Sequence, residues 1–180
     1  MKRKVRELIA ELAWLIRKYI KIDEFTVIDE EKAIKALGGK IVYDVPSGEL
    51  GYVKRIGKDS FEIHIPNALM ADRPQRRWLI FRLAGHLILH MCYMIDEATW
   101  EQADTYKVPG SNSEDYIEAC EFARYMIMPR NDYVRVLKQC EVTVTIDDRK
   151  QVDLSPIVER FIVPTHVVIE QGRRLGVLSW

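Results

Sequence analysis

The sequence predicts one α+β domain, with helices packed on a small antiparallel sheet, from three observations. A chain of 180 residues is long enough for one domain with a real core and short for two. Apolar residues make up 48% and charged residues 30%, which is typical of globular proteins. The apolar spacing is helical at first, alternates over about residues 41–65, and is helical again towards the C-terminus. This succession favours one α+β fold over residues 1–180.

The first predicted element is an amphipathic helix at the N-terminus. Charged residues at positions 6, 7, 11 and 17 interrupt what would otherwise be the apolar segment of a signal peptide. No run approaches the roughly 20 apolar residues that a membrane-spanning helix needs, so we expect no membrane partner. The apolar residues spaced by three or four are Val5, Leu8, Ile9, Leu12, Leu15, Ile16 and Ile20.

Charge and cysteine usage narrow the class of protein. Lys and Arg together number 27, as do Asp and Glu, so the zero net charge gives no general attraction to nucleic acid or anionic membranes. Cys92, Cys120 and Cys140 form neither a C-x-x-C pair nor an even set. We therefore expect reduced thiols in a cytoplasmic protein.

A short helix and three strands are expected next. The helix follows Asp29, a suitable N-cap, and ends at a pair of glycines. Alternating apolar residues, separated by turns that contain Pro or Gly, then predict an antiparallel meander that Pro66 ends. The expected ranges are 30–37 for the helix and 41–45, 52–56 and 61–65 for the strands.

Further helices follow the strands. Pro74 suits the first turn of a long helix. Ser111 to Glu114 has the S-x-x-E form of a capping box, and Pro129 ends the helix that it opens. The polar stretch 96–110 between these helices is expected to be a mobile loop. The expected helices are 74–93, 112–128, about 132–138, 154–161 and 165–174, the last two separated at Val163-Pro164.

The stretch RLAGHLILH, residues 82–90, carries two histidines four positions apart. On a helix, His86 and His90 lie on one face and could reach one ion. Zinc peptidases use this spacing in H-E-x-x-H, where the glutamate accepts a proton from zinc-bound water. The residues between these two histidines are aliphatic, so the usual general base is absent.

Two motifs together resemble the ImmA/IrrE-type zinc metallopeptidases. RWLIFRLAGHLILH, residues 77–90, is similar to the family's R-F-x-x-A-H-E-x-G-H-x-x-L-H. EACEFARYMIMP, residues 118–129, is similar to its E-A-x-x-F-A-x-x-L-L-M-P, and the IHIPN strand and the tail also match in part. The resemblance begins at about residue 30 and implies a single zincin-like domain.

The resemblance also assigns places in the site. Arg82 stands where the first zinc histidine belongs and Leu83 where the glutamate belongs, while His86 and Glu118 match ligand places. No catalytic residue is therefore assigned, and neither a metal nor another cofactor is favoured. A guanidinium in place of the metal predicts an ion pair between Arg82 and Glu118. The implied binding pocket consists of Arg82, His86, Glu118, His64 and Asn67.

Other residues receive structural interpretations. We expect His86 to be buried and hydrogen-bonded, and His90 to pack beside it. Taken alone, His64 and His166 are expected at the surface or at caps. Three arginines on the first turns of the long helix are expected to form a solvated face: Arg73, Arg76 and Arg77.

The favoured function is that of a pseudoenzyme of this fold, without hydrolysis. Active members of the family cut helix-turn-helix repressors, so the resemblance implies transcription regulation in a phage, mobile-element or stress-response setting. The expected partner is a regulatory protein, such as a helix-turn-helix repressor. The oligomeric state is left open.

Two alternatives also stay open. One is an active zinc endopeptidase with a shifted ligand set, His86, His90 and Glu118, and another base. The other is a DNA-binding regulator that uses a helix-turn-helix-like tail at about residues 153–176, with Arg173 and Arg174 near the DNA backbone. The balanced charge makes DNA the less favoured partner. We expect Phe161, Val163 and Val167 to be buried as part of the domain.

Overall fold

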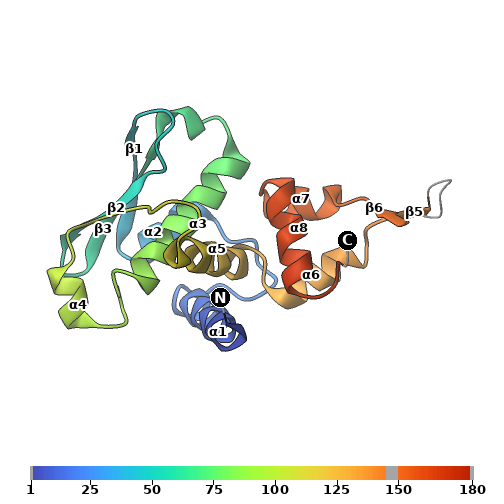
Figure 1. The fold of residues 1–180 in the computed structure, drawn as a ribbon, viewed down its shortest axis with the longest axis horizontal. Coiled ribbons are helices and arrows are strands. Elements are labelled where there is room, and N and C mark those ends of the chain that lie inside the picture. Colours follow the sequence, from blue (N-terminus) through green and yellow to red (C-terminus); the bar gives the residue numbers. More distant parts are fainter. Residues whose placement is uncertain (1, 145–149, 179–180) are drawn as a thin grey trace.

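A mixed four-stranded sheet lies at the left of the molecule in Figure 1. The structure is a computed structural model that describes residues 2–144 and 150–178. The spatial order of the strands is β1-β3-β2-β4, with β1 parallel to β3 and the other two pairs antiparallel. The strands are β1 Gly39–Val45, β2 Tyr52–Gly57, β3 Ser60–Pro66 and β4 Thr105–Lys107.

The prediction of a purely antiparallel sheet is wrong, because β1 pairs with β3 and not with β2. Gly51, just before β2, lets the chain pass close to β3 at the crossing. An added Cβ at Gly51 would lie 2.5 Å from the carbonyl oxygen of His64, and its φ of +80° suits glycine. The chain thus passes close to the end of β3 and enters β2 on the side opposite β1.

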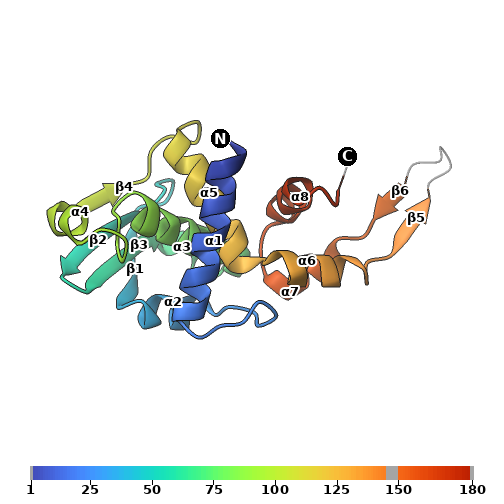
Figure 2. The same ribbon diagram turned by 90° about the horizontal axis from the view of Figure 1, so that it is seen from below.

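Helices α2 and α3 pack against this sheet, with α5 behind α3 and α1 behind α5 (Figures 1 and 2). The predicted packing of the two motif-bearing helices side by side is confirmed for α3 and α5, and α1 packs across α5. The cap predicted at Asp29 is also present, because its carboxylate accepts a hydrogen bond from the amide of Lys32 at 2.8 Å. The helices are α1 Arg3–Tyr19, α2 Glu30–Ala36, α3 Arg73–Leu89 and α5 Glu114–Ile127, with a 3₁₀ turn, η1, at Asn67–Leu69.

Helix α3 forms the centre of the core and is buried from Arg77 to Ile88. The solvated face predicted for its first turns is wrong for Arg77, which is fully buried. Its Nη1 donates to Glu30 Oε2 at 2.6 Å, and Glu30 is itself buried at the start of α2. Helix α2 therefore covers this side of α3, and Arg73 and Arg76 approach the same carboxylate at 3.9 and 3.7 Å.

The segment predicted as a loop, 96–110, has secondary structure of its own. Asp96 accepts a hydrogen bond from the amide of Thr99 at 2.7 Å and caps α4, Glu97–Gln102. Strand β4 then pairs with β2 at the sheet edge. The cap of α5 is Ser113, whose Oγ accepts from the amide of Tyr116 at 3.1 Å, and not the predicted Ser111.

The C-terminal elements form a smaller lobe at the right of Figures 1 and 2. The predicted burial of Phe161, Val163 and Val167 is confirmed. Ile162 ends α7 in the left-handed region, with a φ of +52°. The elements of this lobe are α6 Arg130–Leu137, the hairpin β5 Val142–Val144 and β6 Lys150–Val152, α7 Ser155–Phe161 and α8 Thr165–Arg174.

Buried polar contacts join this smaller lobe to the end of α5. Gln171 Nε2 donates to the carbonyl oxygen of Met128 at 2.9 Å. Arg124, also buried, bonds to Glu121 at 2.5 Å and to Glu170 of α8 at 2.7 Å. These contacts hold α8 against the helical core.

No helix in the described ranges 2–144 and 150–178 is long and apolar enough to cross a membrane.

Candidate functional site

The predicted site lies where α3 and α5 are closest. Gly85 of α3 faces Ala119 of α5, and a Cβ at residue 85 would be only 2.9 Å from the Cα and carbonyl oxygen of Ala119. A glycine at this position therefore permits the close packing. It places His86 of α3, and His90 just after the helix, beside the first turns of α5, where Glu118 lies.

Arg82 does not form the predicted ion pair with Glu118, so that prediction is wrong. Arg82 Nη1 instead donates to the hydroxyl of Tyr116 at 2.7 Å, and its guanidinium lies 4.7 Å from the centroid of the Tyr116 ring. Tyr116 and Glu118 are two positions apart on α5, so their side chains leave the helix in different directions. Arg82 is buried, and its Nε has no hydrogen-bond partner among the described residues.

His86 is fully buried, as predicted. Its Nδ1 lies 3.1 Å from Nδ1 of His90, whereas its Nε2 has no hydrogen-bond partner in the described part of the chain. Burial lowers the pKa of His86 to about 3, and the charges of His90 and Arg82 act in the same direction. A neutral imidazole is therefore the form at His86 near neutral pH.

His90 connects His86 to the carboxylates of α5. Its Nε2 lies 3.5 Å from Glu118 Oε2 and 3.8 Å from Asp115 Oδ1. Both distances exceed those of an ordinary charged hydrogen bond. The packing role predicted for His90 agrees with this arrangement, in which its two ring nitrogens face different neighbours.

Tyr106 of β4 covers both histidines. Its ring centroid lies 5.0 Å from that of His86 and 5.7 Å from that of His90, and the interplanar angles of 28° and 18° make both contacts stacked. The Tyr106 hydroxyl donates to Asp115 Oδ2 at 2.6 Å. Burial and this carboxylate raise the pKa of Tyr106. The site is thus closed on one side by an aromatic ring from the segment predicted as a loop.

The residues of this cluster do not fit a zinc ion. His86 and His90 turn the same nitrogen, Nδ1, towards each other, and Glu118 approaches the opposite nitrogen of His90. Three donors that bind one zinc ion would instead converge on a single point at about 2 Å from each. No group of three His, Cys, Asp or Glu residues in the described ranges could hold a metal ion.

His64 lies in a second polar cluster, on the sheet, and the surface position predicted from its sequence context is wrong. It is buried, with Nδ1 2.8 Å from Asp44 Oδ1 and Nε2 3.0 Å from Glu62 Oε2. Its ring stacks on Tyr52 at 4.3 Å. A carboxylate thus lies at hydrogen-bond distance from each ring nitrogen of His64.

Two other predicted positions are solvent-exposed. Asn67, expected in the pocket, is exposed at the start of η1. His166, expected at the surface, is exposed on the first turn of α8. The structure thus brings Arg82, His86 and Glu118 to the α3–α5 contact.

The cysteines are free thiols, as expected. Cys120 is buried on α5, and desolvation raises the pKa of its thiol. Cys92 and Cys140 are partly buried. A raised pKa disfavours the reactive thiolate, so the structure supports a packing role for Cys120.

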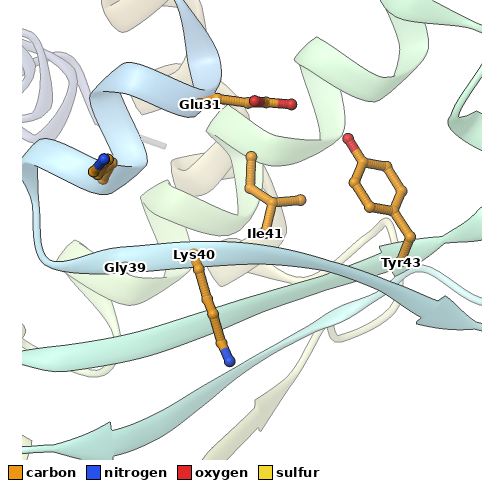
Figure 3. A pocket seen from close by; sticks show the side chains of 6 residues that line it. Glu31, Gly39, Lys40, Ile41 and Tyr43 are labelled. Carbon is orange, nitrogen blue, oxygen red and sulfur yellow. The ribbon is translucent and has the colours of Figure 1, made fainter.

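A separate hollow lies between α2 and β1, with a volume of about 410 Å³ (Figure 3). Figure 3 shows Ile41 and Tyr43 on the face of β1 towards the helices, with Lys40 on the opposite face. Lys40 Nζ pairs with Glu62 at 2.6 Å and thus belongs to the surroundings of His64. The hollow is lined by Glu31, Lys35, Gly39, Lys40, Ile41 and Tyr43.

Sequence reasoning missed Tyr106, Tyr116 and Asp115. Tyr116 and Asp115 lie two and three positions before Glu118 in the same predicted helix, so that helix could have placed them near the site. Tyr106 lies in a strand of only three residues, too short to show alternation.

A comparison of the chain with models of known protein families and with curated proteins finds no match.

Proposed function

We propose that this protein has a zincin-like fold of the ImmA/IrrE type and acts by binding a regulatory protein, without hydrolysing it. One observation carries the proposal. At the two places where the resemblance expects a zinc ligand and a general base, Arg82 donates to Tyr116 and Leu83 is fully buried.

The chemistry of these two residues argues against the usual hydrolysis. A guanidinium stays protonated and repels a divalent cation, and an aliphatic side chain accepts no proton. The ring of Tyr106 stacks on both histidines. Proton transfer would therefore need a group other than those at the matched places.

The rim of the site favours a basic partner segment. Glu114 is exposed, Asp115 is about half exposed, and the Glu118 side chain is 29% exposed. All three lie on the first turns of α5, and Asp115 and Glu118 approach His90. Helix-turn-helix repressors carry Lys and Arg for DNA phosphates, so their charge complements this rim.

The test uses helix-turn-helix repressors encoded in the same genome. Each is mixed with the purified protein and one equivalent of zinc, and followed by titration calorimetry and intact mass. We expect one repressor to bind and stay intact. Cleavage that a chelator abolishes, together with one equivalent of bound zinc, would replace this proposal with the shifted-ligand peptidase.

The variant Glu118→Gln keeps the shape of the side chain and removes its charge. We expect it to weaken repressor binding, with a steeper effect at low salt, because the contact is electrostatic. Glu159→Gln, an exposed position on α7, is the matched control. Equal binding by both variants would place the contact elsewhere.

A further inference from the structure

Helix α1 has one wide apolar face, and only one edge of it is fully buried within the chain. Ile9, Ala13 and Ile16 are buried, on the side of α1 that packs against α5. Figure 2 shows α1 in front of α5, with its other side uncovered. A stripe along the other edge consists of Val5, Leu8, Leu12, Leu15 and Tyr19, of which Val5 and Leu12 are partly buried against the core.

Three members of this stripe are exposed to solvent. Leu8 is 64% exposed, Leu15 is 48% exposed and Tyr19 is 60% exposed. Tyr19 also lines a hollow of about 640 Å³ together with Met94 and Ile95, which are 44% and 53% exposed. The exposed apolar residues therefore extend from α1 onto the segment after α3, and contiguous patches of this kind mark interaction sites.

The spacing of the stripe is that of a helix-pairing seam. Its members are separated alternately by three and four residues, as positions a and d of a heptad are. Val5, Leu12 and Tyr19 take position a, and Leu8 and Leu15 take position d.

Charged residues flank the seam on one side. Lys4, Glu11 and Lys18 precede the three a positions and are all exposed, so they take position g. The other flank, position e, holds Ile9 and Ile16, which are buried on the α5 side of the helix. Only the g flank is therefore free to meet charges on a partner.

We propose that α1 docks against α1 of a second copy of this chain, in the antiparallel direction. In a parallel pair each g residue meets an e residue, and the e flank is already covered by α5. In an antiparallel pair g meets g. Setting Leu12 of one copy opposite Leu15 of the other also sets Leu8 opposite Tyr19.

The same register pairs opposite charges. It brings Glu11 of each copy next to Lys18 of the other, which gives two identical ion pairs across a two-fold axis. Lys18 Nζ lies 4.3 Å from the Trp14 ring centroid, an exposed and weak contact that an ion pair can replace. The N-terminal turns of the second copy would lie near Met94 and Ile95.

Sedimentation velocity over a range of protein concentrations tests the proposal. We expect a monomer–dimer equilibrium with a dissociation constant on the order of micromolar, because one pair of short helices makes a small interface. Leu8→Glu should raise this constant at least about tenfold. Leu50→Glu, at an exposed leucine in the β1–β2 connection, is the control and should leave it unchanged.

A charge exchange tests the register. Glu11→Lys and Lys18→Glu should each weaken the dimer, because each places like charges opposite one another. The double variant should restore it to near the wild-type constant. A monomer at all concentrations, a dimer that Leu8→Glu leaves intact, or a double variant as weak as the single ones would each overturn the proposal. Circular dichroism confirms that each variant is folded.

Discussion

Arg82 shows why a motif match did not predict its partner. The resemblance placed Arg82 and Glu118 at neighbouring ligand positions, and charge alone suggested that they would pair. The hydroxyl of Tyr116 lies at hydrogen-bond distance, whereas the Glu118 carboxylate turns to His90. Side-chain direction on α5 therefore decides the partner.

Tyr116→Phe removes the acceptor for Arg82 and keeps the aromatic ring over the guanidinium. We expect the free energy of unfolding to fall by about 1–2 kcal/mol, because a buried charged donor loses its partner. Chemical denaturation measures this change. Tyr19→Phe, at an exposed tyrosine, is the control and should change the stability by less than about 0.5 kcal/mol.

Glu118→Ala should have a smaller effect than the predicted ion pair would imply. The carboxylate is partly exposed and makes only the long contact with His90. We expect a loss of less than about 1 kcal/mol, as for other exposed pairs. A loss of several kcal/mol in the same denaturation experiment would mean that Glu118 has a buried charged partner after all.

His86 makes the stability of the protein depend on pH. Its pKa is about 3 in the folded chain against 6.5 as the ordinary value, so the unfolded chain binds the proton more readily. The stability that the neutral form of His86 contributes is fully present above about pH 6.5 and is lost as the pH falls towards 3. Between pH 7 and pH 5 the loss is about 2 kcal/mol.

Unfolding at a series of pH values measures this dependence. His86→Gln should flatten the slope between pH 7 and pH 5 relative to the wild type. His166→Gln, at an exposed histidine, should keep the wild-type slope. An unchanged slope in His86→Gln would show that another group carries the dependence.

At the scale of elements, periodicity predicts the helices well. The predicted range of α8 equals the observed one, and the predicted range of α3 differs by one residue at its start and four at its end. Strand β4 and the β5–β6 hairpin were missed, because strands of three residues show no period, and the six-residue helix α4 was missed as well. Strand order was also missed, since alternation shows which face of a strand each residue is on but not which strand lies next to it.

The candidate site was predicted only in part for a related reason. Helical spacing brings Arg82 and His86 of α3 to one region, and the second motif brings Glu118. The closing residue, Tyr106, comes from the missed strand β4. Its position depends on pairing between β4 and β2, which is a tertiary contact and leaves no local pattern.

Gly85 sets the distance between α3 and α5. Gly85→Ala gains helix propensity of about 1 kcal/mol, but the new Cβ would lie 2.9 Å from backbone atoms of Ala119. Because backbone cannot move aside locally, we expect a net loss of about 1–3 kcal/mol on thermal or chemical unfolding. Gly110→Ala, where nothing lies within 4 Å, is the control. Equal stability of the two variants would contradict the close packing.

At the scale of the whole molecule, one arginine joins distant parts of the chain. Arg17 of α1 is buried and donates to the carbonyl oxygens of Met126 at 2.5 Å and Thr26 at 2.8 Å, and to that of Asp23. It thus connects α1, the end of α5 and the segment before α2. Burial lowers its pKa to about 10, so it stays charged at neutral pH.

Arg17→Met keeps the length of the side chain and removes these donors. We expect the free energy of unfolding to fall by about 2–4 kcal/mol, because buried carbonyl oxygens lose their partner. Calorimetry or denaturation measures the change. Arg3→Met, whose wild-type side chain is 87% exposed, should change it by less than about 0.5 kcal/mol. Similar values for the two variants would show that Arg17 contributes no more than a surface charge.

The strand order also has a kinetic consequence. Strands β2 and β3 are joined by a short turn, whereas β1 and β3 pair although all of β2 separates them in the sequence. Local contacts close with less loss of chain entropy, so the β2–β3 hairpin should form before β1 adds to it. Val53→Ala, in β2, should therefore slow folding, with a φ-value above about 0.5, whereas Val45→Ala, at the end of β1, should mainly speed unfolding. Stopped-flow measurements that give the reverse order would mean that the parallel pair nucleates the sheet.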